Sequence, residues 1–164
     1  MGRKILFITT DQQRYDTLGC NGGTIARTPV MDGVAAAGVR YERAHPQSVV
    51  CMPSRSTMLT GQHVSTHGVW MNGVPLPEDA PSVAEVLQDA GYRTAIIGKP
   101  HFEPFLDPFA RFAENGFARN GNFGPHRGFE HLEFATHGAA GWLHYSQWIG
   151  ANHPEAAQMF YAVL

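Results

Sequence analysis

The sequence contains only two cysteines, Cys20 and Cys51, among its 164 residues. Two cysteines cannot build the disulfide framework that stabilises many small secreted domains, so the ordinary expectation for each is a buried free thiol. Basic residues are not in excess either, because the formal net charge is -2 at pH 7. This charge excludes a broadly basic surface for nucleic acid or for an anionic membrane, so a few local residues must recognise any anion.

Long apolar runs are also missing. After Arg3 and Lys4 only a short apolar run precedes Asp11, which is too short for a signal-peptide core and far too short for a membrane span. No later stretch reaches spanning length, so we expect a cytoplasmic protein with no membrane partner. The length suits about one domain, and 43% hydrophobic residues are enough to form its core.

Several common catalytic motifs are absent, namely GxGxxG, Walker A, GxSxG, HExxH and CxxC. Dinucleotide-binding, P-loop, serine-hydrolase, zincin and thioredoxin functions therefore lose their usual support. In contrast, the chain has 18 glycines, 11 prolines and nine histidines, which indicates many loops and favours a metal or acid–base site.

Strand and helix patterns alternate along the first two thirds of the chain. Residues 4–10 (KILFITT) and 92–99 (YRTAIIGK) are typical of buried strands, and residues 39–45 alternate like a strand. Helices are predicted over residues 28–38, from Pro53 to Gly61, and over residues 81–91, where Ser82 is the cap and Glu85 completes a capping box. The fold class is therefore α/β, with a largely parallel sheet flanked by helices.

The regular pattern breaks down after residue 103. Residues 104–164 are rich in Phe, Gly, Pro and Asn and predict a loop-rich excursion, with a terminal helix from Pro154. There is no internal repeat and no low-complexity tract.

Asp11 and Lys99 each stand at the end of a predicted strand. In parallel sheets ligands lie beyond the carboxyl ends of the strands, so both residues are expected in one site. Gln12 adds a carboxamide oxygen, and hard oxygen donors suit Ca²⁺, Mg²⁺ or Mn²⁺. Adjacent side chains on a strand point to opposite faces, so both serve one metal only if the backbone turns there. A helix cap or turn is the alternative interpretation.

The segment CMPSR places Cys51 just before a predicted helix. The free amides and the dipole at a helix start favour an anion or a thiolate, and Arg55 binds tetrahedral oxyanions well. In the segment GKPHF, Lys99 and His101 alternate, so both are expected to face one site across Pro100. A lysine neutralises oxyanion charge and a histidine transfers protons. A buried structural thiol, a surface lysine and a structural histidine remain the alternatives.

Together these segments resemble the N-terminal part of the type I sulfatase family, within the alkaline phosphatase superfamily. CMPSRSTMLTG is similar at every fixed position to the signature Cys-x-Pro-Ser-Arg-x-x-x-Leu-Thr-Gly. ILFITTDQQRYDTLGC resembles the opening metal-binding strand, and VAEVLQDAGYRTAIIGKPHF resembles the helix and strand that deliver a catalytic lysine and histidine. The likeness covers roughly residues 3 to 134 and implies an alkaline-phosphatase-like sulfatase domain.

The resemblance implies that Cys51 is oxidised after translation to Cα-formylglycine, whose hydrated aldehyde attacks sulfur. Pro53, Ser54 and Arg55 would belong to the sequence that the formylglycine-generating enzyme reads. Arg55 would also hold the diol, Lys99 would bind the sulfate oxyanion, and His101 would assist the diol.

The resemblance also implies a metal held by Asp11, Gln12 and residue 51. Gln12 stands where many family members have a second aspartate, so the site has one negative charge fewer. Ca²⁺ is expected, with Mn²⁺ and Mg²⁺ as alternatives.

Family members are much longer, and their later half supplies further metal ligands. Nothing selects His137, His144 or His153 for that role. We therefore expect residues 1–164 to be the N-terminal part of a catalytic domain, incomplete alone and able to self-associate through an exposed sheet edge.

The leading interpretation is a hydrolase of small-molecule or saccharide sulfate esters, which the Lys99-x-His101 pair favours. A phosphonate monoester or phosphodiester hydrolase with the same chemistry is the first alternative. A non-catalytic fragment with an unmodified Cys51 is the second.

Overall fold

The computed structural model describes residues 2–105, 107, 109, 111–136 and 143–161. The chain divides into two compact units, with the boundary between His45 and Pro46.

The first unit contains two short 3₁₀ turns and one helix, namely η1 (Tyr15–Thr17), η2 (Gly19–Asn21) and α1 (Pro29–Ala37). The carboxylate of Asp32 on α1 accepts hydrogen bonds from the Cys20 amide at 2.7 Å and from the Thr28 hydroxyl at 3.1 Å. Gly19 permits this approach, because an added Cβ would lie 2.5 Å from an Asp32 oxygen. Asp32 therefore fixes η2 to the start of α1, the helix predicted over residues 28–38.

The two strands predicted in this unit are wrong, because residues 4–10 and 39–45 have no strand conformation. Residues 5–8 expose between 61% and 84% of their apolar side chains. A strand needs a neighbour to satisfy its backbone groups and to cover one face. Within the described residues, the sheet is formed by two other strands, and neither pairs with residues 4–10.

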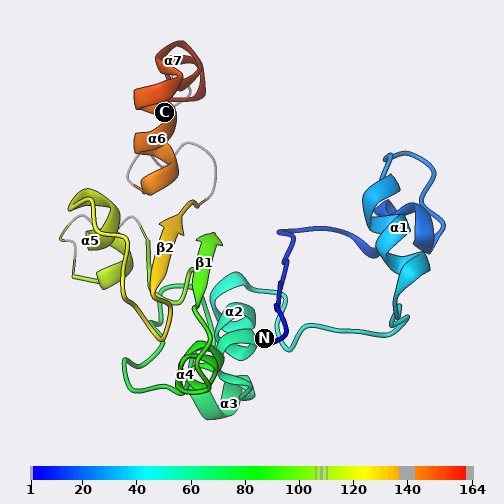
Figure 1. Cartoon of the computed structure of the whole chain (residues 1–164), viewed down its shortest axis with the longest axis horizontal. Helices are drawn as coiled ribbons and strands as arrows, with labels where there is room; N and C mark the ends of the chain where they lie inside the picture. The colour runs from blue at the N-terminus through cyan, green and yellow to red at the C-terminus, as the bar shows by residue number, and fades with distance from the viewer. Residues whose placement is uncertain (1, 106, 108, 110, 137–142, 162–164) are drawn as a thin grey trace. The chain divides into compact units, whose positions relative to one another are not determined.

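The second unit contains the sheet and the helices around it, which are labelled in Figure 1. In chain order its elements are α2 (Cys51–Thr60), α3 (Val64–His67), α4 (Val83–Asp89), β1 (Ala95–Gly98), α5 (Ala113–Arg119), β2 (His131–Phe134), α6 (His144–Asn152) and α7 (Pro154–Tyr161). The cap predicted for α4 is confirmed, because the Ser82 hydroxyl accepts the Ala84 amide at 3.1 Å. The terminal helix from Pro154 is confirmed as α7.

Strands β1 and β2 are parallel and lie side by side, with Ala95 opposite His131 and Gly98 opposite Phe134. The predicted α/β class with a parallel sheet is confirmed. Residues 104–164, predicted to be rich in loops, also contain α5, β2 and α6, which the sequence did not indicate. Strand β2 alternates only over four residues, after a stretch rich in glycine, which is too short a pattern to stand out.

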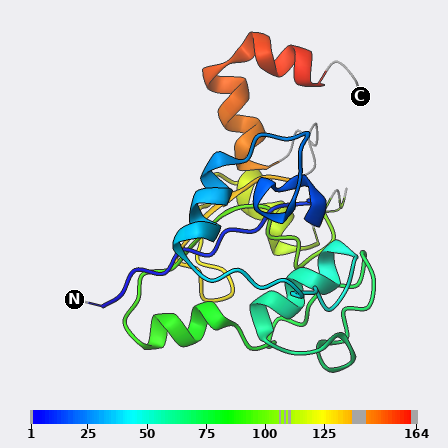
Figure 2. The same cartoon turned by 90° about the vertical axis from the view of Figure 1, so that its right-hand side faces the viewer.

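Two apolar clusters form the core of this unit, and Ile96 and Phe129 pack against both. The first contains Met52, Leu59, Val69, Leu76 and Phe102. The second contains Ala118, Leu132, Phe134 and Leu143. Figure 2 shows that α6 and α7 meet at a sharp bend, at His153. No helix in the described part of the chain is both long and apolar enough to cross a bilayer.

Candidate active site

Cys51 is the first residue of α2, so the helix begins two residues before the predicted start at Pro53. Pro53 is tolerated in the first turn because amides there have no acceptor within the helix. The helix ends at Gly61 as predicted, where the left-handed backbone has a φ of 68°. Cys51 carries a free, half-buried thiol, Pro53 is buried and Ser54 is half-buried. Cys51 therefore lies at the positive end of the helix dipole.

Asn72 completes the hydrogen bonding at this helix start. Its Oδ1 accepts the Met52 amide at 2.9 Å, and the sulfur of Met52 accepts the Gly73 amide at 3.2 Å. Met52 itself is fully buried. No sequence pattern marks Asn72, because it lies 20 positions from the amide that it caps.

Replacing Asn72 with alanine is expected to lower the free energy of unfolding by about 1 kcal/mol, the usual loss for a helix cap. Asn72→Asp is the matched control, because a carboxylate keeps the acceptor and adds a favourable charge at the helix start. Urea unfolding of the three proteins measures the difference. Equal stability of Asn72→Ala and the wild type would show that the cap contributes nothing.

His67, on α3, binds a side chain of α2. Its Nδ1 accepts the Val69 amide at 3.1 Å, which leaves the proton on Nε2 to donate to the Thr57 hydroxyl at 3.0 Å. Burial lowers the pKa of His67, so this neutral tautomer persists at pH 7.

Arg55 joins α2 to the segment that follows β1. Its Nη1 donates a hydrogen bond to the carbonyl oxygen of Lys99 at 2.5 Å, across 44 positions of sequence. Arg55 and Cys51 are four residues apart on α2 and therefore share one face of the helix. The predicted residues Cys51, Arg55 and Lys99 thus belong to one packed region.

Lys99 and His101 line one small cavity of about 10 Å³, together with Phe105, Glu114 and others. This volume has room for about one water molecule. Strand alternation, as predicted, is not the reason for their shared direction, because β1 ends at Gly98. Instead the backbone turns at His101, which has a φ of 57° and is 4% exposed. Such a left-handed conformation is uncommon outside glycine and is frequent at functional sites.

Asp11 and Gln12 belong to the first unit and are exposed. The φ of Gln12 is 54°, so the backbone turns there, which is the condition for two adjacent side chains to serve one ion. Their carboxylate and carboxamide oxygens fit a hard cation. Cys51, the third ligand predicted for the same ion, belongs to the second unit.

The three further histidines have other surroundings. His144 is buried, and its Nδ1 accepts the Phe134 amide at 3.1 Å while Nε2 lies 2.9 Å from the Asn122 carbonyl oxygen. His153 is exposed and packs edge-on against Trp148. His137 lies outside the described residues. His144 therefore has a structural role, in which both ring nitrogens are used.

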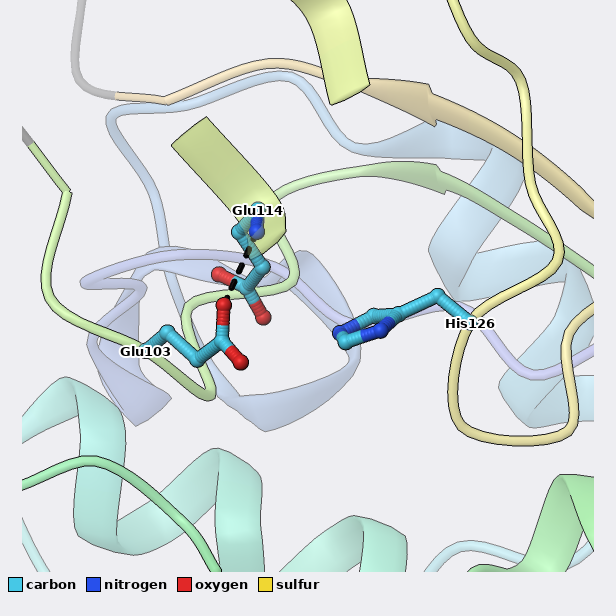
Figure 3. Close-up of side chains that lie close together, drawn as sticks. All are labelled: Glu103, Glu114 and His126. Carbon is cyan, nitrogen blue, oxygen red and sulfur yellow. Dashed lines mark hydrogen bonds between the residues drawn. The ribbon is translucent and has the colours of Figure 1, made fainter. Parts of the chain in front are cut away.

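Glu114 also belongs to a largely buried polar cluster with Glu103 and His126, which no sequence pattern predicted. Figure 3 shows the ring of His126 directed toward the carboxylates of Glu103 and Glu114. One ring nitrogen and one oxygen of each carboxylate all lie within 4.8 Å of one another. Burial and the charge of Glu103 raise the pKa of Glu114 to about 8, so Glu114 is mostly protonated at pH 7. Burial and the nearby Arg127 lower the pKa of His126 to about 4, so its ring is neutral.

The protonated Glu114 makes stability depend on pH. Its ordinary pKa is 4.5, so between that value and about 8 the folded chain holds a proton that the unfolded chain has lost. Stability is therefore expected to fall as pH rises through this window, by up to about 1.4 kcal/mol per pH unit. Glu114→Gln has no such proton, so its stability relative to the wild type should rise over the same window. Urea unfolding at several pH values tests this, and parallel pH profiles would contradict it.

Comparisons with known proteins agree on one family. A family model named Sulfatase matches residues 3–136. The uncharacterized sulfatase YidJ of Escherichia coli K12 is 36% identical over 98 residues, which are 60% of this chain and 20% of YidJ. The N-acetylglucosamine-6-O-sulfatase of Bacteroides thetaiotaomicron is 35% identical over 97 residues, which are 59% of this chain and 17% of that protein.

Solved structures give a similar result. The phosphonate monoester hydrolase of Agrobacterium radiobacter superposes with a TM-score of 0.66 and 27% identity, over 90% of this chain and 28% of that one. BT4656, in complex with its substrate D-glucosamine-2-N,6-O-disulfate, gives a TM-score of 0.61 and 27% identity, over 77% of this chain and 22% of that one.

The fold is thus the α/β fold shared by alkaline-phosphatase-like sulfatases and phosphonate monoester hydrolases. Because the family model covers most of its length, the chain belongs to the sulfatase family. It spans about a fifth of the length of the curated relatives it matches, with 20% and 17% of the two named above.

Proposed function

We propose that the protein carrying this chain hydrolyses sulfate esters, with a formylglycine made from Cys51 and a divalent metal ion. The observation that carries the proposal is the hydrogen bond from Arg55 to the Lys99 carbonyl at 2.5 Å. This bond holds the helix that begins with Cys51 against the segment that carries Lys99 and His101. Family membership and the signature from Cys51 to Gly61 support the same reaction.

In this proposal the sulfate group binds between the start of α2 and the segment that carries Lys99 and His101, and both offer positive groups. Residue 51 lies at the positive end of the α2 dipole. Arg55 lies one turn along the same face of that helix and carries a guanidinium, which suits tetrahedral oxyanions. In this proposal Arg55 holds the oxygens at residue 51, and the Lys99 ammonium neutralises charge on the sulfate oxygens. His101 holds or transfers a proton at residue 51. When residue 51 is modified, its hydrated aldehyde supplies the nucleophilic oxygen.

The metal is proposed from the donors that the chain offers. Asp11 and Gln12 would hold it together with residue 51, and their hard oxygens make Ca²⁺ the expected ion, with Mn²⁺ or Mg²⁺ as alternatives. When bound, the ion supplies Lewis-acid polarisation of the ester. The backbone turn at Gln12 supports the use of both neighbouring side chains.

A saccharide sulfate is the substrate class that we propose. The relative from Bacteroides thetaiotaomicron is named an N-acetylglucosamine-6-O-sulfatase. The substrate of BT4656 is a disulfated glucosamine. Both names support a sulfated sugar as the ester for this protein.

Hydrolysis of phosphonate monoesters is the second candidate, because the phosphonate monoester hydrolase superposes over the larger share of this chain. Parallel rate measurements on an aryl sulfate and an aryl phosphonate monoester separate the two. The protein is prepared with the maturation enzyme and Ca²⁺. We expect the sulfate to react faster, and a faster phosphonate reaction would replace the proposal with the second candidate. Absence of both reactions would contradict both.

A further inference from the structure

We infer that Glu114 is a positioning residue for His101. Its buried carboxyl holds the amide of Phe102 and so fixes the peptide that follows His101, with the ring of His101 on the cavity that it shares with Lys99. The inference rests on the proposed function, because it assigns Glu114 to the support of a residue that would handle protons there.

The hydrogen bonds between α5 and this segment are reciprocal. The Phe102 amide donates to Oε1 of Glu114 at 3.0 Å, and the Glu114 amide donates to Oε2 of Glu103 at 2.8 Å. Glu103 is 4% exposed and Glu114 is 3% exposed, so water does not compete for either bond. The direction of the Phe102 amide defines the ψ angle of His101, the residue with the left-handed φ. Glu114 therefore acts directly on the unusual turn.

Asn115, next to Glu114 on α5, binds the backbone of the same segment further along the chain. Its Nδ2 donates to the Pro104 carbonyl at 2.7 Å, and its Oδ1 accepts the Asp107 amide at 3.4 Å. The first turn of α5 thus binds backbone groups of Phe102, Pro104 and Asp107.

Arg127 links Glu103 to the backbone at Leu76 and Pro77. Its guanidinium lies 3.5 Å from Oε1 of Glu103 and donates at 2.8 Å to the carbonyl oxygens of Leu76 and Pro77. The Leu76 amide in turn donates to the Phe102 carbonyl at 2.8 Å. Both backbone groups of Phe102 are therefore held, one by Glu114 and one by Leu76.

The cluster of Glu103, Glu114 and His126 is better explained as a set of groups that hold the backbone after His101 than as a cation site. Both oxygens of Glu103 and one oxygen of Glu114 already receive hydrogen bonds or an ion pair. The cationic Arg127 beside Glu103 opposes a metal ion. Glu114 also lines the cavity with Lys99 and His101, so the charge that it gains as pH passes about 8 acts on both of them.

Kinetics of the protein that carries this chain, matured and loaded with Ca²⁺, give the first test. Glu114→Ala is expected to lower kcat by about 10-fold to 100-fold with KM unchanged, because a displaced catalytic group has effects of this size. Glu114→Gln keeps the acceptor and should keep the rate at neutral pH. In the wild type a fall in kcat is expected as pH passes about 8, where Glu114 ionises beside Glu103, His126 and Arg127 and opposite Lys99 and His101. The Gln variant should lack this fall, and the exposed Glu155→Gln should retain it.

Amide hydrogen exchange gives a second test that needs no turnover. Exchange at Phe102 should be about 10-fold to 100-fold faster in Glu114→Ala and unchanged in Glu114→Gln, because one buried hydrogen bond is removed. If Glu114→Ala does not fold, the pH profile of the Gln variant decides. Wild-type protection at Phe102 in Glu114→Ala, or a Gln variant with the wild-type pH profile, would overturn the inference. A wild type without turnover but with the expected exchange would contradict only the proposed function.

Discussion

Replacing Cys51 with alanine is expected to abolish ester hydrolysis, with a loss in kcat of about 10⁴-fold or more, as when other enzymes lose a covalent nucleophile. Alanine cannot be oxidised to the aldehyde, and the remaining groups at the start of α2 would bind sulfate without attacking it. Steady-state rates on an aryl sulfate measure the loss.

The second cysteine provides a matched control. Cys20 is also half-buried and free, but it lies in the first unit, where its amide donates to Asp32. Cys20→Ala removes a thiol of the same kind and should retain activity. Full activity in Cys51→Ala, or equal losses in both variants, would show that residue 51 has no special chemistry.

Replacing Phe134 with alanine is expected to lower the free energy of unfolding by about 3–5 kcal/mol, the range for a large aromatic side chain in a core. Phe134 is fully buried and packs with Leu132 and Leu143. Its ring also lies edge-on to Phe117, with centroids 6.3 Å apart. Urea unfolding monitored by circular dichroism measures the effect.

Glu133→Ala is the control, because Glu133 is the neighbour of Phe134 on β2 and points to the exposed side. Its only described partner is His131, in an exposed pair at 2.9 Å. Such pairs contribute at most about 1 kcal/mol. Similar losses for the two variants would show that β2 is not part of the core.

Short-range patterns explain what could be predicted from the sequence. The start and end of α4 depend on Ser82 and Gly91, which lie within a turn of the helix that they delimit. The signature from Cys51 to Gly61 is likewise contained in one helix and its cap. Only the exact start of α2 differed, because proline is tolerated anywhere in the first turn.

Features that depend on distant partners could not be predicted. Strand β2 pairs with β1 from 36 positions away, as the bonds between Thr94 and Glu130 illustrate. Asn72 and Glu114 act on amides 20 and 12 positions away. Residues 4–10 show the converse, since an apolar β-branched run does not form a strand unless a partner pairs with it.

The turn at His101 depends both on local sequence and on a distant partner. The GKPHF segment predicted that Lys99 and His101 face one site through strand alternation. In the structure both line one cavity, but β1 ends at Gly98, so alternation is not the reason. A strand would have placed them on one face by alternation, whereas the structure does so with a left-handed residue held by Glu114. Local sequence cannot reveal such a conformation, because the group that holds it comes from α5.

The most direct test of the proposed chemistry is peptide mass spectrometry across residue 51, on protein produced together with the maturation enzyme. We expect formylglycine in place of Cys51, because Pro53, Ser54 and Arg55 complete the sequence that the enzyme would read. An unmodified thiol throughout the preparation would contradict the proposal and would favour a non-catalytic role for this chain.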